Sequence, residues 1–325
     1  MGIFVRIAGW IVVGIGLVAG QETGRQPVPT SPASAPLPQV AQASQGTPTG
    51  NRVLVISIDG GRPDLLLRAG MPNLRRLMRE GSYSMWAKTT AKAVTLPSHV
   101  SMLLGVSPNV HQIFWNTDLP LEETVYPKAA TLFEVAKKAG YSTALVAGKS
   151  KFAHLNKPGA IDHPWITTDD ATDNASVTRE AVRILEDNKP GVMFVHFPET
   201  DNVGHALGWG TDEQIACFGR TDADIGELLR AIEETGVAGS TFIILSADHG
   251  GQGRVHGPDD VRSRTIPWII RGPGVRATYD LARVVSLEIR TEDTFATACE
   301  VLKIPAGKVE GKPVTAAMKE GELLK

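Results

Sequence analysis

The sequence predicts an α/β fold built on a mostly parallel sheet with helices on both faces. Short apolar runs rich in β-branched residues alternate with amphipathic segments that carry helix signals. The run 52–58, RVLVISI, is apolar almost throughout, as expected for a parallel strand that is covered on both faces. With 42% hydrophobic residues in a chain of 325, there is enough apolar material for one large core.

The first fifty residues are expected to lie outside this fold. Residues 1–20 carry a positive charge at Arg6 and an apolar run at 7–19, the pattern of a secretory signal peptide; an uncleaved amino-terminal anchor is the alternative. Either reading predicts export, to the periplasm or the medium or tethered to the membrane. Residues 21–50 are rich in Pro, Ser, Ala and Gln and predict a disordered linker. Residues 51–325 then form the folded domain.

The charge distribution argues against a nucleic-acid partner, and the cysteine content excludes no class of protein. The formal net charge is −2, and no run of Lys and Arg is dense enough to predict a nucleic-acid-binding patch. No feature indicates a protein partner. Cys217 and Cys299 are the two cysteines, and an oxidising compartment would permit a disulfide if they meet in the fold.

The first half of the domain begins with the strand 52–58, which ends in Asp59 beside two glycines. Pro97 at a first helical position predicts a short buried helix whose amino terminus faces Thr95. A hydroxyl there is well placed to attack phosphorus, because a helix amino terminus favours anions; alternatively, Thr95 caps the helix. The other expected elements are a helix from about Pro72 to Gly81, a helix at 131–139 and a strand at 142–146.

The second half continues the alternation. After a strand at 192–197, Asp201 and His205 stand four residues apart, a spacing that puts both side chains on one face of a helical turn. A strand at 241–245 runs into Asp248 and His249, which are followed by glycines that allow a tight turn. The other expected elements are helices at 175–186, 211–234 and 292–302 and a strand at 266–270.

Three aspartates follow predicted strands, and three histidines lie close behind them. Ligands of open α/β sheets bind beyond the carboxyl ends of the strands. Each residue taken alone reads as an ordinary turn residue, but three converging carboxylates repel one another unless a cation neutralises them. Carboxylates and imidazoles in this number are enough for two zinc-like sites. The six residues are Asp59, Asp201, Asp248, His205, His249 and His256.

Several stretches resemble the alkaline phosphatase superfamily and, within it, the type I phosphodiesterase and nucleotide pyrophosphatase family. They are IDGGRPD, TLPSHVSMLLGVSPNVHQI, PETDNVGH, SADHGG and TEDTFATACEVLKIP, which span most of residues 52–314. The resemblance implies a doubly wound sheet, a two-metal site at its end and a threonine nucleophile in a TxPxH motif. The connections after Asn116, Gly148 and Gly257 are short, which suggests a small cap and an open site.

Carried onto this chain, the resemblance assigns ligands to two divalent metal ions, Zn²⁺ in the first place and Mn²⁺ as the alternative. One ion would take Asp59, Asp248, His249 and the Thr95 oxygen; the other would take Asp201, His205 and a last histidine. In nucleotide pyrophosphatases that histidine lies far downstream, whereas here no histidine follows His256. His256 is therefore its expected match, through a shorter loop.

The resemblance also implies the groups that hold the phosphoryl oxygens. Asn116 matches the family's asparagine, and the backbone N–H of Leu96 would help it. The other histidines of the strands and of the nucleophile segment, His99, His111 and His196, are expected to be structural.

The implied function is that of a two-metal phosphohydrolase of the phosphodiesterase or nucleotide pyrophosphatase type. It would act on a small-molecule phosphate ester through a covalent phosphothreonine intermediate. A phosphomonoesterase of the same superfamily is the alternative, since added cations would hold the extra phosphoryl charge; the same cations also read as solvated surface charges. They are Lys149, Lys151, Arg62 and Arg254.

Two further classes stay in view. A sulfatase is disfavoured, because that branch matures a Cys or Ser in a CxPSR-type motif where this chain has Thr95 and LPSH. A non-catalytic, metal-stabilised binding protein at the cell surface is the reading from a different class, and a metal-dependent hydrolysis assay discriminates it from an enzyme.

Overall fold

The computed structural model describes residues 50–117, 124–169 and 172–320. It divides into two units, Met1–Ala43 and Ser44–Lys325, and the described residues all belong to the second. The predicted signal peptide or anchor and nearly all of the predicted linker therefore lie outside the described residues. Among the helices that are described, none combines the length and the apolar character needed to cross a membrane.

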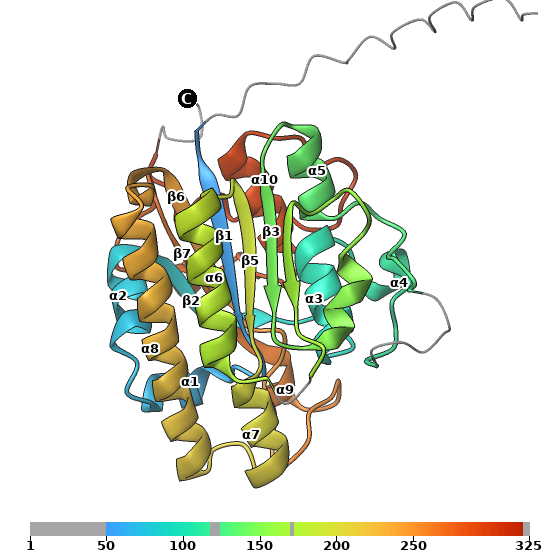
Figure 1. The fold of residues 1–325 in the computed structure, drawn as a ribbon. Helices are drawn as coiled ribbons and strands as arrows, with labels where there is room; N and C mark the ends of the chain where they lie inside the picture. The colour runs from blue at the N-terminus through green and yellow to red at the C-terminus, as the bar shows by residue number, and fades with distance from the viewer. Residues whose placement is uncertain (1–49, 118–123, 170–171, 321–325) are drawn as a thin grey trace, which may run out of the picture. The chain divides into compact units, whose positions relative to one another are not determined.

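An eight-stranded sheet forms the centre of the folded unit (Figure 1). Its strand order is β4-β3-β5-β1-β6-β7-β2-β8, and β7 alone runs antiparallel to its neighbours. This confirms the expected mostly parallel α/β architecture. The strands are β1 (Arg52–Ile58), β2 (Ser82–Lys88), β3 (Thr143–Ala147), β4 (His163–Ile166), β5 (Val192–Phe197), β6 (Thr241–Ser246), β7 (Thr265–Arg271) and β8 (Tyr279–Asp280).

Helices cover both faces of this sheet (Figure 1). They are α1 (Pro63–Arg68), α2 (Pro72–Glu80), α3 (Thr95–Leu104), α4 (Pro108–His111), α5 (Leu132–Lys138), α6 (Asn174–Asn188), α7 (Glu199–Leu207), α8 (Asp212–Glu234), α9 (Val261–Arg264) and α10 (Asp293–Leu302). Short 3₁₀ turns complete the fold: η1 (Ser150–Leu155), η2 (Ala238–Ser240), η3 (Leu281–Arg283) and η4 (Thr315–Ala317).

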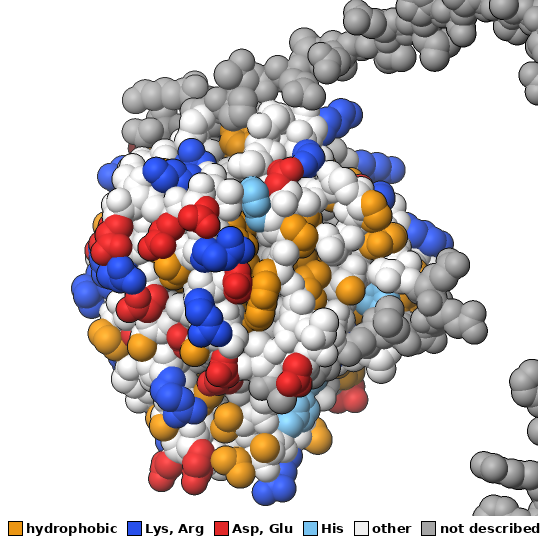
Figure 2. Space-filling view, in the orientation of Figure 1, with side chains coloured by type: hydrophobic (Ala, Val, Ile, Leu, Met, Phe, Trp, Pro, Cys, Tyr) orange, Lys and Arg blue, Asp and Glu red, His pale blue; other side chains and the backbone are white. Residues whose placement is uncertain are grey.

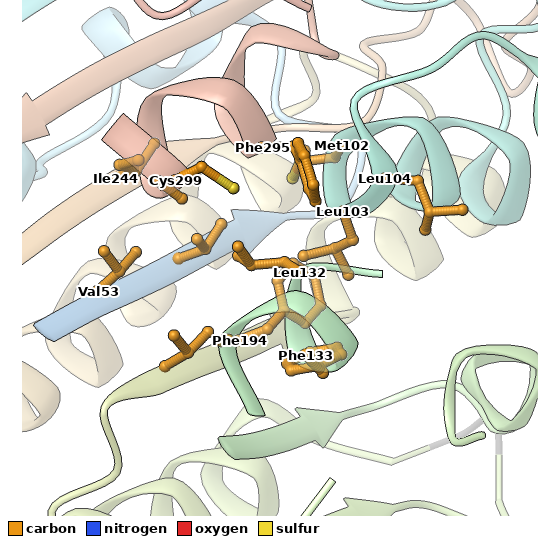
Figure 3. Packing of buried hydrophobic residues seen from close by; sticks show 14 of the residues in the cluster. Val53, Met102, Leu103, Leu104, Leu132, Phe133, Phe194, Ile244, Phe295 and Cys299 are labelled. Carbon is orange, nitrogen blue, oxygen red and sulfur yellow. The ribbon is translucent and has the colours of Figure 1, made fainter. Parts of the chain in front are cut away.

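The side chains of β1 alternate between two hydrophobic cores. Val53 belongs to the core that includes residues of α3, α5 and α10, whereas Leu54 belongs to the core that includes residues of α1, α2, α6 and α8. Figure 3 shows side chains of the first core, among them Val53 and Phe194 of the sheet, Phe133 of α5, and Phe295 of α10 beside Met102 of α3. A central strand buried on both faces reads as a continuous apolar run, which is why residues 52–58 do not alternate with polar residues.

Most predicted elements are present with boundaries shifted by one or two residues. Thr131 begins α5 with a complete capping box, and the Thr211 side chain accepts a hydrogen bond from Gln214 at the start of α8. Helix α3 starts at Thr95 itself, two residues before Pro97, and its N-cap is Val94. The alternative that Thr95 caps the helix is therefore wrong.

The two cysteines do not form a disulfide. Both are buried and free, Cys299 on α10 in the first core and Cys217 on α8, where it lies 3.8 Å from a Glu199 carboxylate oxygen. Burial raises the pKa of both thiols to about 12, so both stay protonated.

Positive and negative side chains are interspersed on the face covered by α6 and α8 (Figure 2). Arg183 pairs with Glu180 and Asp187 along α6, and Arg230 pairs with Glu227 and Glu234 along α8. Such exposed pairs one helical turn apart contribute little to stability individually, but they leave this face without a field of one sign.

Candidate metal centre and active site

Three adjacent strands deliver three aspartates to one edge of the sheet. Asp59 follows β1 directly, Asp248 follows the end of β6 by two residues, and Asp201 lies on α7, which begins just after β5. Because β1 lies between β5 and β6, the three carboxylates meet beyond its carboxyl end, the edge beside α7 in Figure 1. All three side chains are almost fully buried.

Glycines allow the chain segments to approach this closely. Gly60 has a φ of +70°, and a Cβ on it would lie 3.2 Å from the Asp201 Cα, so a larger residue would be both strained and crowded. Its N–H donates to Asp248 Oδ1 at 3.1 Å. A Cβ on Gly250 would lie 2.1 Å from the Arg262 carbonyl oxygen, which explains part of the glycine-rich run after His249.

Each of the three candidate histidine ligands has one ring nitrogen fixed by a backbone carbonyl. A carbonyl oxygen only accepts, so Nδ1 carries the proton and Nε2 presents a lone pair to the centre. The partners are Arg254 O for His205 at 3.0 Å, Gly250 O for His249 at 2.9 Å and Ala93 O for His256 at 3.0 Å.

The loop after His249 turns back through a bridge between Gln252 and Val255, which brings His256 over His249 with ring centroids 3.7 Å apart. His256 Nε2 then lies 3.1 Å from His205 Nε2 and 3.8 Å from Asp201 Oδ1. The short loop therefore turns His256 into the centre.

Among the residues that the structure describes, two groups of possible metal ligands have ligand atoms within 4.8 Å of one another. The first comprises Asp201, His205 and His256, the three residues predicted for the second metal ion. The second comprises Asp59, Asp201 and His249, so Asp201 lies between both groups. Asp248, predicted for the first ion, presents Oδ2 to His249 Nε2 at 3.1 Å, beside the second group.

The hydrogen bonds that these residues lack indicate that divalent cations fit here. Oδ1 of Asp59, Oδ1 of Asp201 and Oδ2 of Asp248 are buried without a hydrogen-bond partner, which is costly for carboxylates. The Nε2 lone pairs of the histidines face these oxygens and one another. Oxygen and imidazole donors in this arrangement suit a zinc-like ion.

A lysine enters the centre from β3. Lys149 is buried, and its Nζ lies 2.7 Å from Asp59 Oδ2 and 2.6 Å from Asp201 Oδ2. Burial alone would lower the pKa of Lys149, but the two carboxylates raise it well above its ordinary value. The interpretation of Lys149 as a solvated surface charge is wrong.

The three aspartates differ in their electrostatic surroundings. Burial favours the neutral acid, yet Lys149 and His196 hold the pKa of Asp59 well below its ordinary value. Asp248 has no such partner, and burial, together with the charges of Asp59 and Asp201, raises its pKa well above 3.8.

The predicted nucleophile faces this centre. Thr95 is buried at the first position of α3, and its Oγ1 lies 3.5 Å from His249 Nε2. The Leu96 N–H was expected to help hold a phosphoryl oxygen. In the structure it donates instead to Asn116 Oδ1 at 2.8 Å. This bond leaves the Asn116 amide Nδ2 as the donor that can do so.

The other predicted cations lie at different depths. Lys151 is half-buried and donates to the Asn116 carbonyl oxygen at 3.1 Å, which brings it beside the nucleophile segment. Arg62 is held by Asp64 and by the Gly251 carbonyl, and Arg254 is exposed.

The histidines expected to be structural are all buried. His99 bonds Ser57 and the Thr95 carbonyl, and His111 bonds Ser101. His196 differs from a plain core residue, because its Nε2 lies 2.9 Å from Asp59 Oδ2.

Sequence reasoning missed Trp209. Its indole donates to the Gly60 carbonyl at 3.1 Å, and its ring packs edge-on against His205 and His256 with centroids 5.2 and 5.9 Å away. It thereby supports two candidate ligands. A lone tryptophan after a helix-ending glycine carries no sequence signal for that role.

Comparisons with known proteins agree with this geometry. The model of the family described as type I phosphodiesterase / nucleotide pyrophosphatase matches residues 53–261. An uncharacterised pyrophosphatase/phosphodiesterase of Schizosaccharomyces pombe is 25% identical over 222 residues, covering 61% of this chain and 44% of that protein. Ectonucleotide pyrophosphatase/phosphodiesterase family member 1 of Homo sapiens is 23% identical over 236 residues, covering 66% and 24%.

This chain thus spans less than half the length of the curated relatives that it matches. Among solved structures, murine ectonucleotide pyrophosphatase/phosphodiesterase 5 in complex with AMP superposes with a TM-score of 0.70 at 12% identity, covering 83% of this chain and 100% of that chain. The likeness shows a common fold.

Proposed function

Because the chain belongs to the type I phosphodiesterase/nucleotide pyrophosphatase family, we propose that it is a two-metal phosphohydrolase that cleaves small phosphodiesters or pyrophosphates through Thr95. One observation carries the proposal. Unsatisfied carboxylate oxygens and imidazole lone pairs converge in front of a buried threonine at a helix amino terminus. The substrate class follows the names of the relatives, which are pyrophosphatases and phosphodiesterases.

The residues around the threonine suggest how the reaction proceeds. The Thr95 hydroxyl gives up its proton to water and forms a bond to phosphorus while the ester bond breaks and the leaving oxygen takes up a proton from water; a water molecule then adds to phosphorus, which releases the phosphate and restores the Thr95 hydroxyl. The Asn116 amide would donate to a nonbridging oxygen, held in place by its bond to Leu96. Two divalent ions, Zn²⁺ or alternatively Mn²⁺, would supply Lewis-acid stabilisation of the oxygens that gain charge. Asp59, Asp201, Asp248, His205, His249 and His256 would hold them.

The test is Thr95→Ala. We expect turnover of an aryl phosphodiester such as bis(p-nitrophenyl) phosphate to fall by at least a thousandfold, while the bound metal, measured by elemental analysis, stays close to the wild-type amount. Wild-type turnover in this variant would exclude Thr95 as the nucleophile. Failure of the unmodified, metal-loaded protein to hydrolyse any phosphate ester would favour a non-catalytic, metal-stabilised binding protein instead.

A phosphomonoesterase is the second candidate, and the position of Lys151 favours it. Its ammonium binds the Asn116 carbonyl, close to where the phosphoryl oxygens would lie. A monoester carries one more negative charge than a diester, so a cation there would favour the monoester. If this candidate is correct, Lys151→Met lowers hydrolysis of p-nitrophenyl phosphate at least tenfold more than that of the diester. An equal loss on both would remove the support that Lys151 gives.

We also infer from the amino-terminal pattern that the protein is exported. Residues 7–19 form an apolar run preceded by Arg6, as in a signal peptide or an anchor. Cell fractionation and amino-terminal sequencing of the mature protein test this. Cytoplasmic protein with residues 1–20 retained would contradict it.

A further inference from the structure

Lys149 is the one described lysine that contacts two of the candidate metal ligands at once, and neither of the proposed phosphoryl-binding roles explains that contact. The main chain forces it into the centre. Gly148 follows β3, its N–H donates to the His196 carbonyl, and a Cβ on it would lie 2.5 Å from the Pro198 ring. The carboxyl end of β3 therefore packs tightly against that of β5, and Lys149 follows at the edge where the carboxylates meet.

The Lys149 ammonium contacts one oxygen of each of two carboxylates and leaves the other oxygen of each without a partner. Lys149 binds Oδ2 of both Asp59 and Asp201, while Oδ1 of each stays without a partner. The two free oxygens lie 3.4 and 4.0 Å from His249 Nε2, among the candidate ligand atoms. Each aspartate therefore offers one oxygen to a cation and keeps the other on the lysine.

The charge of Lys149 changes the net charge of the metal centre. Three aspartates and one lysine bring the formal charge of the centre to −2, and two divalent ions would bring it to +2. Without the ammonium, the loaded centre would carry one positive charge less. A centre that must attract an anionic phosphate benefits from the additional charge.

Resting on the proposed function, we propose that Lys149 is a positioning residue that acts as a built-in cation of the metal centre. It neutralises one carboxylate charge, leaves Asp59 and Asp201 one free oxygen each and so raises the net charge of the metal-loaded centre by one unit. It acts through the aspartates, not by touching the substrate.

This role and a purely structural role predict opposite changes in metal affinity when the charge of Lys149 is removed. The ammonium and the divalent ions share the same carboxylates and repel one another at short range. By holding Asp59 and Asp201 in place, Lys149 also lowers the conformational entropy cost of metal binding, but this gain in binding free energy is smaller than the loss from the repulsion. Removing the positive charge should therefore tighten metal binding, whereas removing a structural support would weaken it.

The test is Lys149→Met, which keeps an unbranched side chain and removes the charge. We expect Zn²⁺ alone, titrated against a fluorescent chelator, to bind at least tenfold more tightly than to the wild type, about 1.4 kcal/mol. We expect the metal-free variant to melt at a lower temperature, because its aspartates lose their counter-ion. The control is Lys157→Met, a surface lysine paired with Glu134, which should change neither value. Unchanged or weaker Zn²⁺ binding in Lys149→Met overturns the inference.

A double-mutant cycle keeps the inference testable if the single variant folds poorly. Removing one carboxylate charge together with the ammonium, in Lys149→Met/Asp201→Asn, should restore the metal-free melting temperature toward that of the wild type. Losses that simply add overturn the inference. A wild-type protein that binds neither Zn²⁺ nor Mn²⁺ would instead refute the proposed function, so the two failures are distinguishable.

Discussion

At the residue scale, Asp248 is a metal-centre aspartate whose charge is disfavoured in the metal-free protein. It lacks the cationic partner that Asp59 and Asp201 share, and its pKa is raised well above 3.8 by burial and by those two charges. A raised pKa means that the folded state holds the proton more tightly than the unfolded chain. Stability from this group is therefore complete below pH 3.8 and is lost as pH rises through the folded-state pKa.

The variant Asp248→Asn tests both the role of Asp248 in metal binding and the effect of its charge on stability. The amide keeps an acceptor for the N–H groups of Gly60 and His249 but carries no charge. We expect the metal content to fall by about half or more, and the metal-free variant to lose less stability than the wild type as pH rises from 4 to 8. Elemental analysis and melting curves measure the two. Asp187→Asn, an exposed control on α6, should leave both as in the wild type. Full metal content in Asp248→Asn would remove Asp248 from the ligand set.

Residue types and spacing predicted five of the carboxylate and imidazole residues, because each stands just after a recognisable strand or on a helical turn, whereas His256 was expected from the family resemblance because no histidine follows it. They could not predict the contacts of Lys149 or His196. In the sequence GKSKF, a lysine reads equally well as a surface charge. His196 touches Asp59 because β5 pairs beside β1, with Ser57 opposite His196, and strand neighbours are set by the whole fold.

At the scale of elements, helix α2 has its amino terminus satisfied by a different helix. Its N-cap residue, Met71, offers no side-chain acceptor. Asp222 of α8 supplies two, accepting from the Asn73 N–H at 2.9 Å and from the Leu74 N–H at 2.8 Å. The buried carboxylate thus caps one helix from another and joins α2 to α8.

Removing this cap should destabilise the domain without touching the metal centre. Asp222→Ala leaves the buried Leu74 N–H and the partly buried Asn73 N–H without this acceptor, and we expect a loss of about 1–3 kcal/mol, or roughly 3–10 °C in Tm. Metal content and diester turnover per folded molecule should stay unchanged. Melting curves beside those of an exposed control, Asp187→Ala, measure the effect. A Tm within about 1 °C of that control would show that the Asp222 cap is dispensable for stability.

The turn after β6 makes a matched test of close approach. Gly250→Ala would drive a Cβ against the Arg262 carbonyl oxygen, whereas Gly239→Ala meets no atom within 4 Å. We expect the first to cost about 1–3 kcal/mol and to weaken Zn²⁺ binding, because the same turn carries Asp248 and His249. The second should stay within about 0.5 kcal/mol of the wild type. Equal behaviour of the two variants would contradict the argument.

Elements with strong local signals were predicted well, and those that depend on tertiary pairing were not. Helix α5 has its capping box and β5 its unbroken apolar run. Strand β2, SYSMWAK, mixes polar and apolar residues without a clear period, because it pairs near the edge with an irregular register and exposes Trp86. The antiparallel direction of β7 likewise has no local signal, since either direction suits a buried apolar run.

At the scale of the whole molecule, the metal centre joins the carboxyl ends of three central strands. Both hydrophobic cores lie against β1, and the unsatisfied carboxylates lie at its end. A ligand that binds the folded state alone stabilises it by mass action. Cations at this junction should therefore raise the stability of the entire domain rather than of a single loop.

Removal of divalent ions provides the measurement. At a free Zn²⁺ concentration a thousandfold above Kd, binding adds about 4 kcal/mol, or roughly 8–16 °C in Tm for a domain of this size. We expect chelation to lower Tm by that amount and added Zn²⁺ to restore it. Asp201→Asn should abolish the shift, because Asp201 belongs to both groups of ligand atoms, whereas Asp187→Asn should keep it. A shift of the same size in Asp201→Asn would mean that the stabilising ion binds elsewhere and that the buried carboxylates at the end of β1 serve another purpose.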